Sequence, residues 1–202
     1  MNVELLFPTP VAFFTLDRTL TKSEFSFIET LEQRPNQYNT TSANNYILEH
    51  KKLAKLRLWF QECIDQYTRD ILSPLTDFKL RITQSWANYT MPNAAHHKHA
   101  HPNSYISGVF YPKADITKDK IFFWKSTGWK QIEYQVKEYN KCNSESWWFN
   151  VGTNMLILFP SSLEHTVEPV CDGELRISIA LNTFPVGILG NEYSLTGLTL
   201  KD

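Results

Sequence analysis

The sequence predicts a mainly β protein, a helix-buttressed sandwich or jelly roll, and three observations support this. The first third of the chain carries apolar residues at helical spacing, whereas short runs rich in β-branched and aromatic residues begin at Phe78. Turn residues such as Pro92-Asn93 separate those runs. Aromatic residues make up 14% of the chain, which suits β-rich packing. In 202 residues without a repeat or linker we expect one domain, with a largely helical buttress over 1–77 and the core over 78–202.

Two helices are expected before the strands. Thr21-Lys22-Ser23-Glu24 opens a segment that continues through Arg34 with apolar residues about three apart, and Pro35 follows it. A second segment from Glu49 to Leu72 shows the same spacing, and Pro74 ends it. Both apolar stripes predict helices that pack on the core.

Seven or eight antiparallel strands are expected after the helices. The candidates are Lys79–Tyr89, Tyr105–Tyr111, Lys120–Trp124, Gln131–Val136, Met155–Phe159, Thr166–Glu168 and Glu174–Phe184.

Composition excludes several classes of protein. A net charge of −1 gives no reason to expect nucleic acid or an anionic membrane as a partner. Three scattered cysteines argue against a disulfide framework and for a reducing compartment. The N-terminus does not resemble a signal peptide, and no apolar run approaches the ~18 residues of a spanning helix. The expectation is a cytoplasmic protein without a membrane anchor.

Four of the six histidines lie within His96–His101. Side chains two apart on an extended backbone share a face, so His97, His99 and His101 can point to one side and suit a divalent metal. The alternative is a basic surface loop.

A second signal follows the apolar run that ends at Phe159. His165 comes after it, and Arg176 and Ser178 follow eleven and thirteen positions later in a predicted strand. Alternation puts Arg176 and Ser178 on one face and Ile177 on the other. An arginine facing the interior of a sheet needs an anion, either a ligand carboxylate or a core Asp or Glu.

Together these motifs resemble the iron- and 2-oxoglutarate-dependent oxygenases, and within them a subgroup with His-x-His-Pro and Ser-Gly-Val-aromatic-Tyr motifs. The matching segments are His99-Ala100-His101-Pro102, Ser107-Gly108-Val109-Phe110-Tyr111, Phe159-Pro160-Ser161 and His165-Thr166-Val167-Glu168-Pro169, with further likeness over 6–11 and 85–88. The order and spacing of the motifs are more specific than any one of them.

The resemblance implies a double-stranded β-helix (jelly roll) with N-terminal helices packed on one sheet. It further implies an Fe(II) site formed by His99, His101 and His165. Arg176 and Ser178, with Asn88 in reach, would bind the 2-oxoglutarate cosubstrate. The implied activity is that of a dioxygenase that hydroxylates a small-molecule or peptidyl substrate and releases succinate and CO2.

One departure from the family pattern leaves alternatives open. Most members use two histidines and a carboxylate, whereas position 101 is His, and His97 is a second candidate for the third ligand. Three histidines also describe catalytic zinc. The rival hypotheses are a cupin-like three-histidine metalloenzyme that does not use 2-oxoglutarate and a non-catalytic jelly-roll binding protein.

The substrate cannot be read from the sequence. Tyr105 and Ser107 share a face of their strand, and together with Trp147 they are candidates for lining a substrate pocket. A homodimer formed through the helical face is compatible with the pattern.

Overall fold

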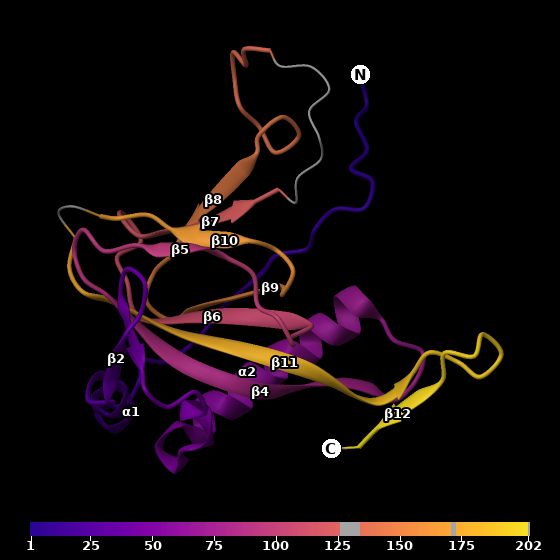
Figure 1. The fold of residues 1–202 in the computed structure, drawn as a ribbon, viewed down its shortest axis with the longest axis horizontal. Coiled ribbons are helices and arrows are strands. Elements are labelled where there is room, and N and C mark those ends of the chain that lie inside the picture. The colour runs from indigo at the N-terminus through magenta and orange to yellow at the C-terminus, as the bar shows by residue number, and fades with distance from the viewer. Residues whose placement is uncertain (126–133, 171–172, 202) are drawn as a thin grey trace.

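The computed structural model describes residues 1–125, 134–170 and 173–201. It contains two antiparallel sheets that face each other, with the helices on the far side of the larger one (Figure 1). This arrangement confirms the mainly β fold with N-terminal helices packed on one sheet. In the described part of the chain, no helix is long and apolar enough to span a membrane.

The large sheet has eight strands. In spatial order they are β1 (Ala12–Thr15), β9 (Met155–Pro160), β6 (Ile106–Lys113), β11 (Arg176–Leu189), β4 (Phe78–Thr90), β3 (Thr40–Ser42) and β2 (Gln33–Pro35), with β12 (Leu198–Leu200) paired to β11. The small sheet has the order β5 (His96–His99), β10 (His165–Val167), β7 (Lys120–Trp124) and β8 (Ser146–Asn150).

Strand β11 shows how alternation divides the molecule into layers. Ile177, Ile179 and Leu181 are fully buried in the cluster that includes the helices. Residues of the opposite parity, including Arg176 and Asn182, therefore face the small sheet. A second apolar cluster, which includes Tyr111 and Phe159, fills the space between the sheets.

The first helix is shorter than the apolar spacing predicts, whereas helical segments cover the second predicted range, Glu49 to Leu72. Helix α1 (Lys22–Glu29) has the capping box of Thr21 and Glu24, but it ends before Arg34. Residues Gln33–Pro35 instead pair with β3, since the residue before a proline disfavours the helical conformation. The second helical region consists of η1 (Ile47–Glu49), η2 (Lys51–Leu53), α2 (Ala54–Tyr67) and the π-helical turn η3 (Thr68–Leu72).

Most predicted strands are confirmed, and β7 has the predicted bounds. Six short strands were not predicted: β1, β2, β3, β5, β8 and β12. They have three to five residues each, too few for alternation to show, and each is stabilised by pairing with another strand. The expected strand Gln131–Val136 lies partly outside the described residues, and 134–136 form no strand.

Candidate metal centre and its surroundings

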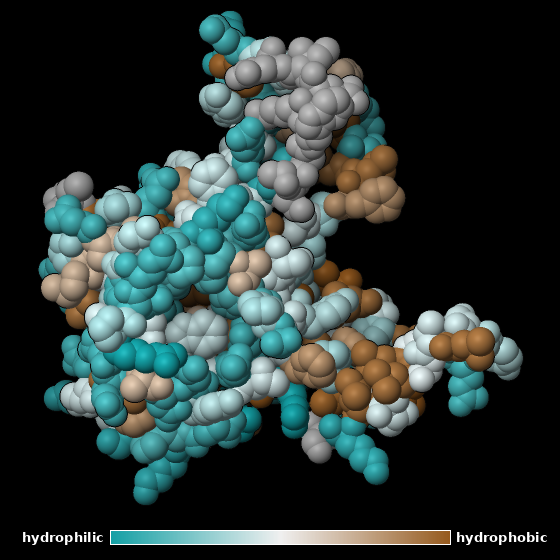
Figure 2. Space-filling model, viewed as in Figure 1, coloured by the Kyte–Doolittle hydropathy of each residue, from teal (hydrophilic) through white to brown (hydrophobic). Residues whose placement is uncertain are grey.

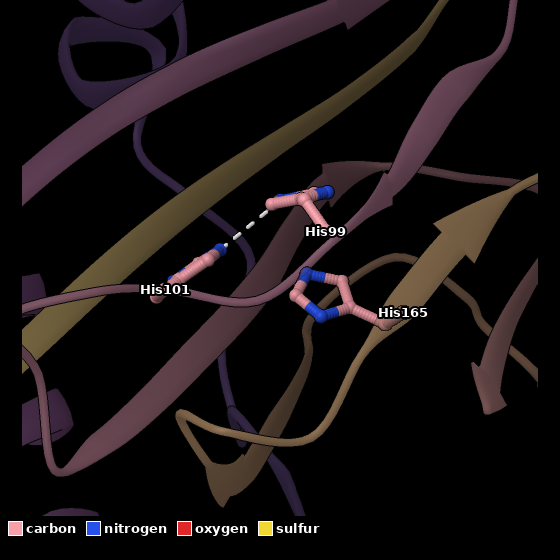
Figure 3. A group of neighbouring side chains, drawn as sticks. All are labelled: His99, His101 and His165. Carbon is pink, nitrogen blue, oxygen red and sulfur yellow. Dashed lines mark hydrogen bonds between the residues drawn. The ribbon is translucent and has the colours of Figure 1, made fainter. Parts of the chain in front are cut away.

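Three histidines from two strand ends meet between the sheets. His99 ends β5 and His165 begins β10, and these two residues are paired in the sheet. His101 follows two residues after His99, and its backbone N–H donates to the Ser161 carbonyl. One ring nitrogen from each of the three lies within 4.8 Å of the others (Figure 3). Among the described residues, this is the one group of three or more His, Cys, Asp or Glu side chains placed so that it could hold a metal ion.

The hydrogen bonds of the three rings leave the same nitrogen available on each. The Nδ1 of His99 lies 2.8 Å from the His97 carbonyl oxygen, and that of His165 lies 3.2 Å from the Leu163 carbonyl oxygen. The Nδ1 of His101 lies 2.7 Å from the side-chain oxygen of Asn182. Because carbonyl oxygens only accept, each Nδ1 carries the proton and each Nε2 keeps a lone pair. Metal-binding histidines have this arrangement.

The distance between two of these nitrogens matches a shared ion. The Nε2 atoms of His99 and His101 are 3.2 Å apart. Two bonds of about 2.1 Å at angles between octahedral and tetrahedral place the nitrogens about 3.0–3.4 Å apart. Two lone pairs at this distance repel each other unless a cation lies between them. The residues therefore fit the metal.

The rings are held neutral, which metal binding requires. Burial, and to a lesser degree the neighbouring His99, lowers the pKa of His101 to about 4. Burial also lowers the pKa values of His99 and His165, the latter well below its usual range. His96 has a pKa of about 3 for the same main reason. His97 is not part of the cluster, and its Nδ1 is buried without a hydrogen-bond partner.

Arg176 is buried in the interior as predicted, but an internal carboxylate already pairs with it. Its Nη1 lies 3.2 Å from an Asp119 oxygen, and the two side chains are 4% and 11% exposed. The other Asp119 oxygen accepts from the backbone N–H of Asp115. The space beside Arg176 is about 10 Å³, which is about one water molecule. This is the core-acid pairing that the sequence left open as an alternative.

The remaining predicted site residues lie in different environments. Ser178 is the cross-strand partner of Asn88, whose side-chain oxygen is buried without a partner. Ser107 is fully buried and bonds to Asn182 and Ser161. Tyr105 is 50% exposed with its ring near Phe78.

Trp147 lies on the small sheet. It is the cross-strand partner of Phe123, which shares a face with it and lies 6.2 Å from the His165 ring. Trp147 therefore faces the space between the sheets.

Three polar residues at the site were not predicted. Asn182 accepts from His101 and from Ser107 and donates to Gln84, so it orients a ligand histidine. Its position in the strand, four and six residues after Ser178 and Arg176, was a usable signal because all three share parity. Asp119 and Gln84 carry no comparable sequence signal.

A cavity of about 410 Å³ opens beside the cluster, within the range of small-molecule sites. Its lining residues include His99 and His101 of the cluster, and also Trp86, Gln84 and Arg34. Figure 2 shows a hollow rimmed mainly by hydrophilic side chains between the regions that Figure 1 labels β2 and β5. Tyr105 and Trp147 are not among the described residues that line this cavity.

Comparison with known proteins agrees with this geometry. Residues 84–182, about half of the chain, match the family model described as putative 2OG-Fe(II) oxygenase. The match includes all three clustered histidines and Arg176. No curated protein has a significantly similar sequence.

Solved structures share the fold at low sequence identity. HygX from Streptomyces hygroscopicus with nickel and 2-oxoglutarate bound has a TM-score of 0.60 at 11% identity, over 96% of this chain and 92% of that one. A prolyl-4-hydroxylase from Pseudomonas putida has a TM-score of 0.57 at 11% identity, covering 88% and 94%. The epimerase SnoN in complex with Fe3+, alpha ketoglutarate and nogalamycin RO has a TM-score of 0.60 at 8% identity, covering 88% and 81%. By its motifs and by the match over residues 84–182 the chain is similar to the 2-oxoglutarate–Fe(II) oxygenases, and it shares the fold of the solved structures.

Proposed function

We propose that the chain binds Fe(II) through His99, His101 and His165 and uses 2-oxoglutarate to hydroxylate a small molecule. The observation that carries this proposal is the common orientation of the three rings. Each donates its Nδ1 proton to an internal acceptor and keeps Nε2 for a shared ion. The cavity of about 410 Å³ beside the cluster offers room for the substrate.

Iron with 2-oxoglutarate supplies oxygen activation, with succinate and CO2 as by-products. The chain contributes orientation and exclusion of water. Asn182 fixes the ring plane of His101, and its own amide is held by Gln84. Phe159 lies against His165, with ring centroids 4.8 Å apart, and excludes solvent from the inner side of the cluster.

For the cosubstrate we propose that its distal carboxylate binds Arg176, with Ser178 and Asn88 nearby. The guanidinium has five N–H donors, and Asp119 uses one in the structure. The hydroxyl of Tyr111 is buried without a partner in the same region. Burial raises its pKa, and the nearby charges of Arg176 and Asp119 shift that pKa in opposite directions. Because the adjoining space is only about 10 Å³, cosubstrate binding must displace Asp119 or the surrounding segment.

The decisive experiment is an anaerobic Fe(II) titration with and without 2-oxoglutarate. We expect a weak visible charge-transfer band in the wild type and a weaker band in Arg176→Ala. Arg57→Ala is the matched control, since Arg57 pairs with Glu49 on the helical side and is 42% exposed. Absence of the band in a folded, metal-loaded protein would contradict the use of 2-oxoglutarate and favour a three-histidine metalloenzyme of another kind.

Hydroxylation needs its own test because proteins of this fold include an epimerase and a carbocyclase. Once a substrate is found, turnover under ¹⁸O₂ should place one labelled oxygen atom in the product. A product without label would indicate a reaction that inserts no oxygen atom, such as epimerisation or ring closure.

A further inference from the structure

The cavity beside the histidines has an uneven distribution of charge. Arg34 is the one Lys or Arg among its described lining residues, and none of those residues is Asp or Glu. A divalent metal held by the histidines would add positive charge. The cavity therefore favours a negatively charged or strongly polar ligand.

Arg34 belongs to a row of polar side chains that crosses the large sheet. Cross-strand pairing joins Arg34 to Thr41, Thr41 to Asn88, and Asn88 to Ser178. Directly paired residues of antiparallel strands share a face, so all four point toward the small sheet. Arg34 lies at the outer end of this row, three strands from β11.

The guanidinium of Arg34 is held by a neutral partner, and no carboxylate of the described residues pairs with it. Its Nη2 donates to the side-chain oxygen of Asn45 at 3.3 Å, and Asn45 also lines the cavity. This neutral acceptor orients the group and leaves other N–H donors for a ligand. Amide groups of Gln84 and Asn36 on the same walls add polar contacts.

Arg176 provides the contrast. It is paired with Asp119 in a separate space of about 10 Å³, whereas Arg34 opens onto the cavity that reaches His99 and His101. Two arginines thus serve two different regions. If Arg176 takes the cosubstrate, Arg34 is left for the other reactant.

We propose that Arg34 binds an anionic group, a carboxylate or a phosphate, of the primary substrate. The inference rests on the proposed function and adds the substrate class. The substrate is a small molecule whose anionic end lies at β2 and whose reacting carbon lies at the histidines. Trp86, which lines the cavity and lies 5.4 Å from the His101 ring, provides a flat apolar wall between these ends.

The test uses the chain loaded with Ni(II) and 2-oxoglutarate, so that both other anion-binding positions are filled. The probes are matched acids and primary amides of one skeleton: benzoate and benzamide, hexanoate and hexanamide, N-acetylglycine and its amide. Affinities come from ligand-observed NMR titrations. We expect the acids to bind on the order of tenfold more tightly than their amides. Arg34→Gln should abolish this preference, and Arg34→Lys should retain part of it.

The controls separate this inference from the proposed function. Arg57→Gln makes the same charge change on the helical side of the sheet and should leave the preference intact. The affinity for 2-oxoglutarate should be unchanged in Arg34→Gln. A loss of that affinity would assign Arg34 to the cosubstrate and overturn the inference, as would equal binding of acids and amides or no binding of any pair. If the Fe(II)–2-oxoglutarate band itself fails to form, the proposed function has failed independently.

Discussion

The histidine cluster and the surroundings of Arg176 lie between the same two sheets, but they differ in whether the groups that would bind a ligand already have an internal partner. The three imidazoles converge with their Nε2 lone pairs turned toward one another. Arg176 already has an internal partner in Asp119. The histidine nitrogens are available to bind a metal ion, whereas the Arg176 guanidinium already binds a carboxylate.

The physical reason is the cost of burying charge. A neutral imidazole can be buried if one nitrogen is hydrogen-bonded, and burial keeps His101 neutral by lowering its pKa to about 4. A guanidinium stays charged and needs an anion. Metal binding is therefore a simple addition, while carboxylate binding at Arg176 is an exchange in which Asp119 gives up its position.

Removing the internal carboxylate should have the largest effect. Asp119→Asn leaves Arg176 buried without a charged partner, and we expect the free energy of unfolding to fall by about 3–5 kcal/mol. If the site takes a carboxylate, 2-oxoglutarate with Ni(II) should stabilise this variant more than the wild type. Urea unfolding with and without the ligands measures both effects.

Asp70→Asn is the control for that experiment, because this carboxylate is exposed, pairs with the exposed Arg69 and should matter little. Equal stabilisation of wild type and Asp119→Asn by 2-oxoglutarate would show that the cosubstrate does not exchange with Asp119.

On the other side of the comparison, His165→Ala should lower metal affinity by at least about 100-fold, because one of three ligands is lost. The control is His50→Ala, since the His50 ring stacks on Phe27 away from the cluster. Isothermal titration with Ni(II) provides the measurement. Similar affinities of the two variants would rule out the proposed ligand set.

A smaller effect is expected from the residue that orients His101. Asn182→Ala removes the acceptor of the His101 Nδ1 proton, and metal affinity should fall about tenfold. Asn182→Asp keeps an acceptor there and should restore most of the affinity. Loss in both variants would mean that the amide N–H donated to Gln84, and not the acceptor for His101, is the contribution of Asn182.

The sequence predicted those features that local pattern determines. Alternation along β11 placed Arg176 in the interior, and the His-x-His spacing brought His99 and His101 to one side. The pairing of His99 with His165 is long-range, and it was reached through resemblance to a family rather than through spacing.

What the sequence could not predict depends on contacts between distant segments. Asp119 follows a turn and carries no motif, yet it lies against Arg176, 57 positions away. Arg34 was expected at the end of a helix, but pairing of β2 with β3 moved it to the cavity. At Asp119 the missing information is a long-range contact, whereas at Arg34 pairing with the nearby strand β3 overrode the helical spacing.

The pair formed by Arg18, which precedes α1, and Glu24 in its first turn gives a partly exposed counterpart to the buried Arg176–Asp119 pair. Two hydrogen bonds of 2.7 and 2.8 Å join the side chains, and Arg18 is 36% exposed. Burial alone would raise the pKa of Glu24, but the hydrogen bonds from Arg18 and Thr21 outweigh it and the pKa is lowered. A lowered folded-state pKa stabilises the fold above the unfolded pKa of about 4.3, and this stabilisation is lost as the pH falls through the folded value.

Glu24→Gln should therefore cost only about 1 kcal/mol at pH 7, because Arg18 keeps part of its hydration and Gln can still accept in the capping box. The difference between variant and wild type should shrink as the pH falls below about 4, since protonated Glu24 then resembles Gln. Thermal unfolding of both proteins between pH 7 and pH 3 measures the difference. A gap that stays constant over this range would mean that the charge of the Glu24 carboxylate contributes nothing to stability.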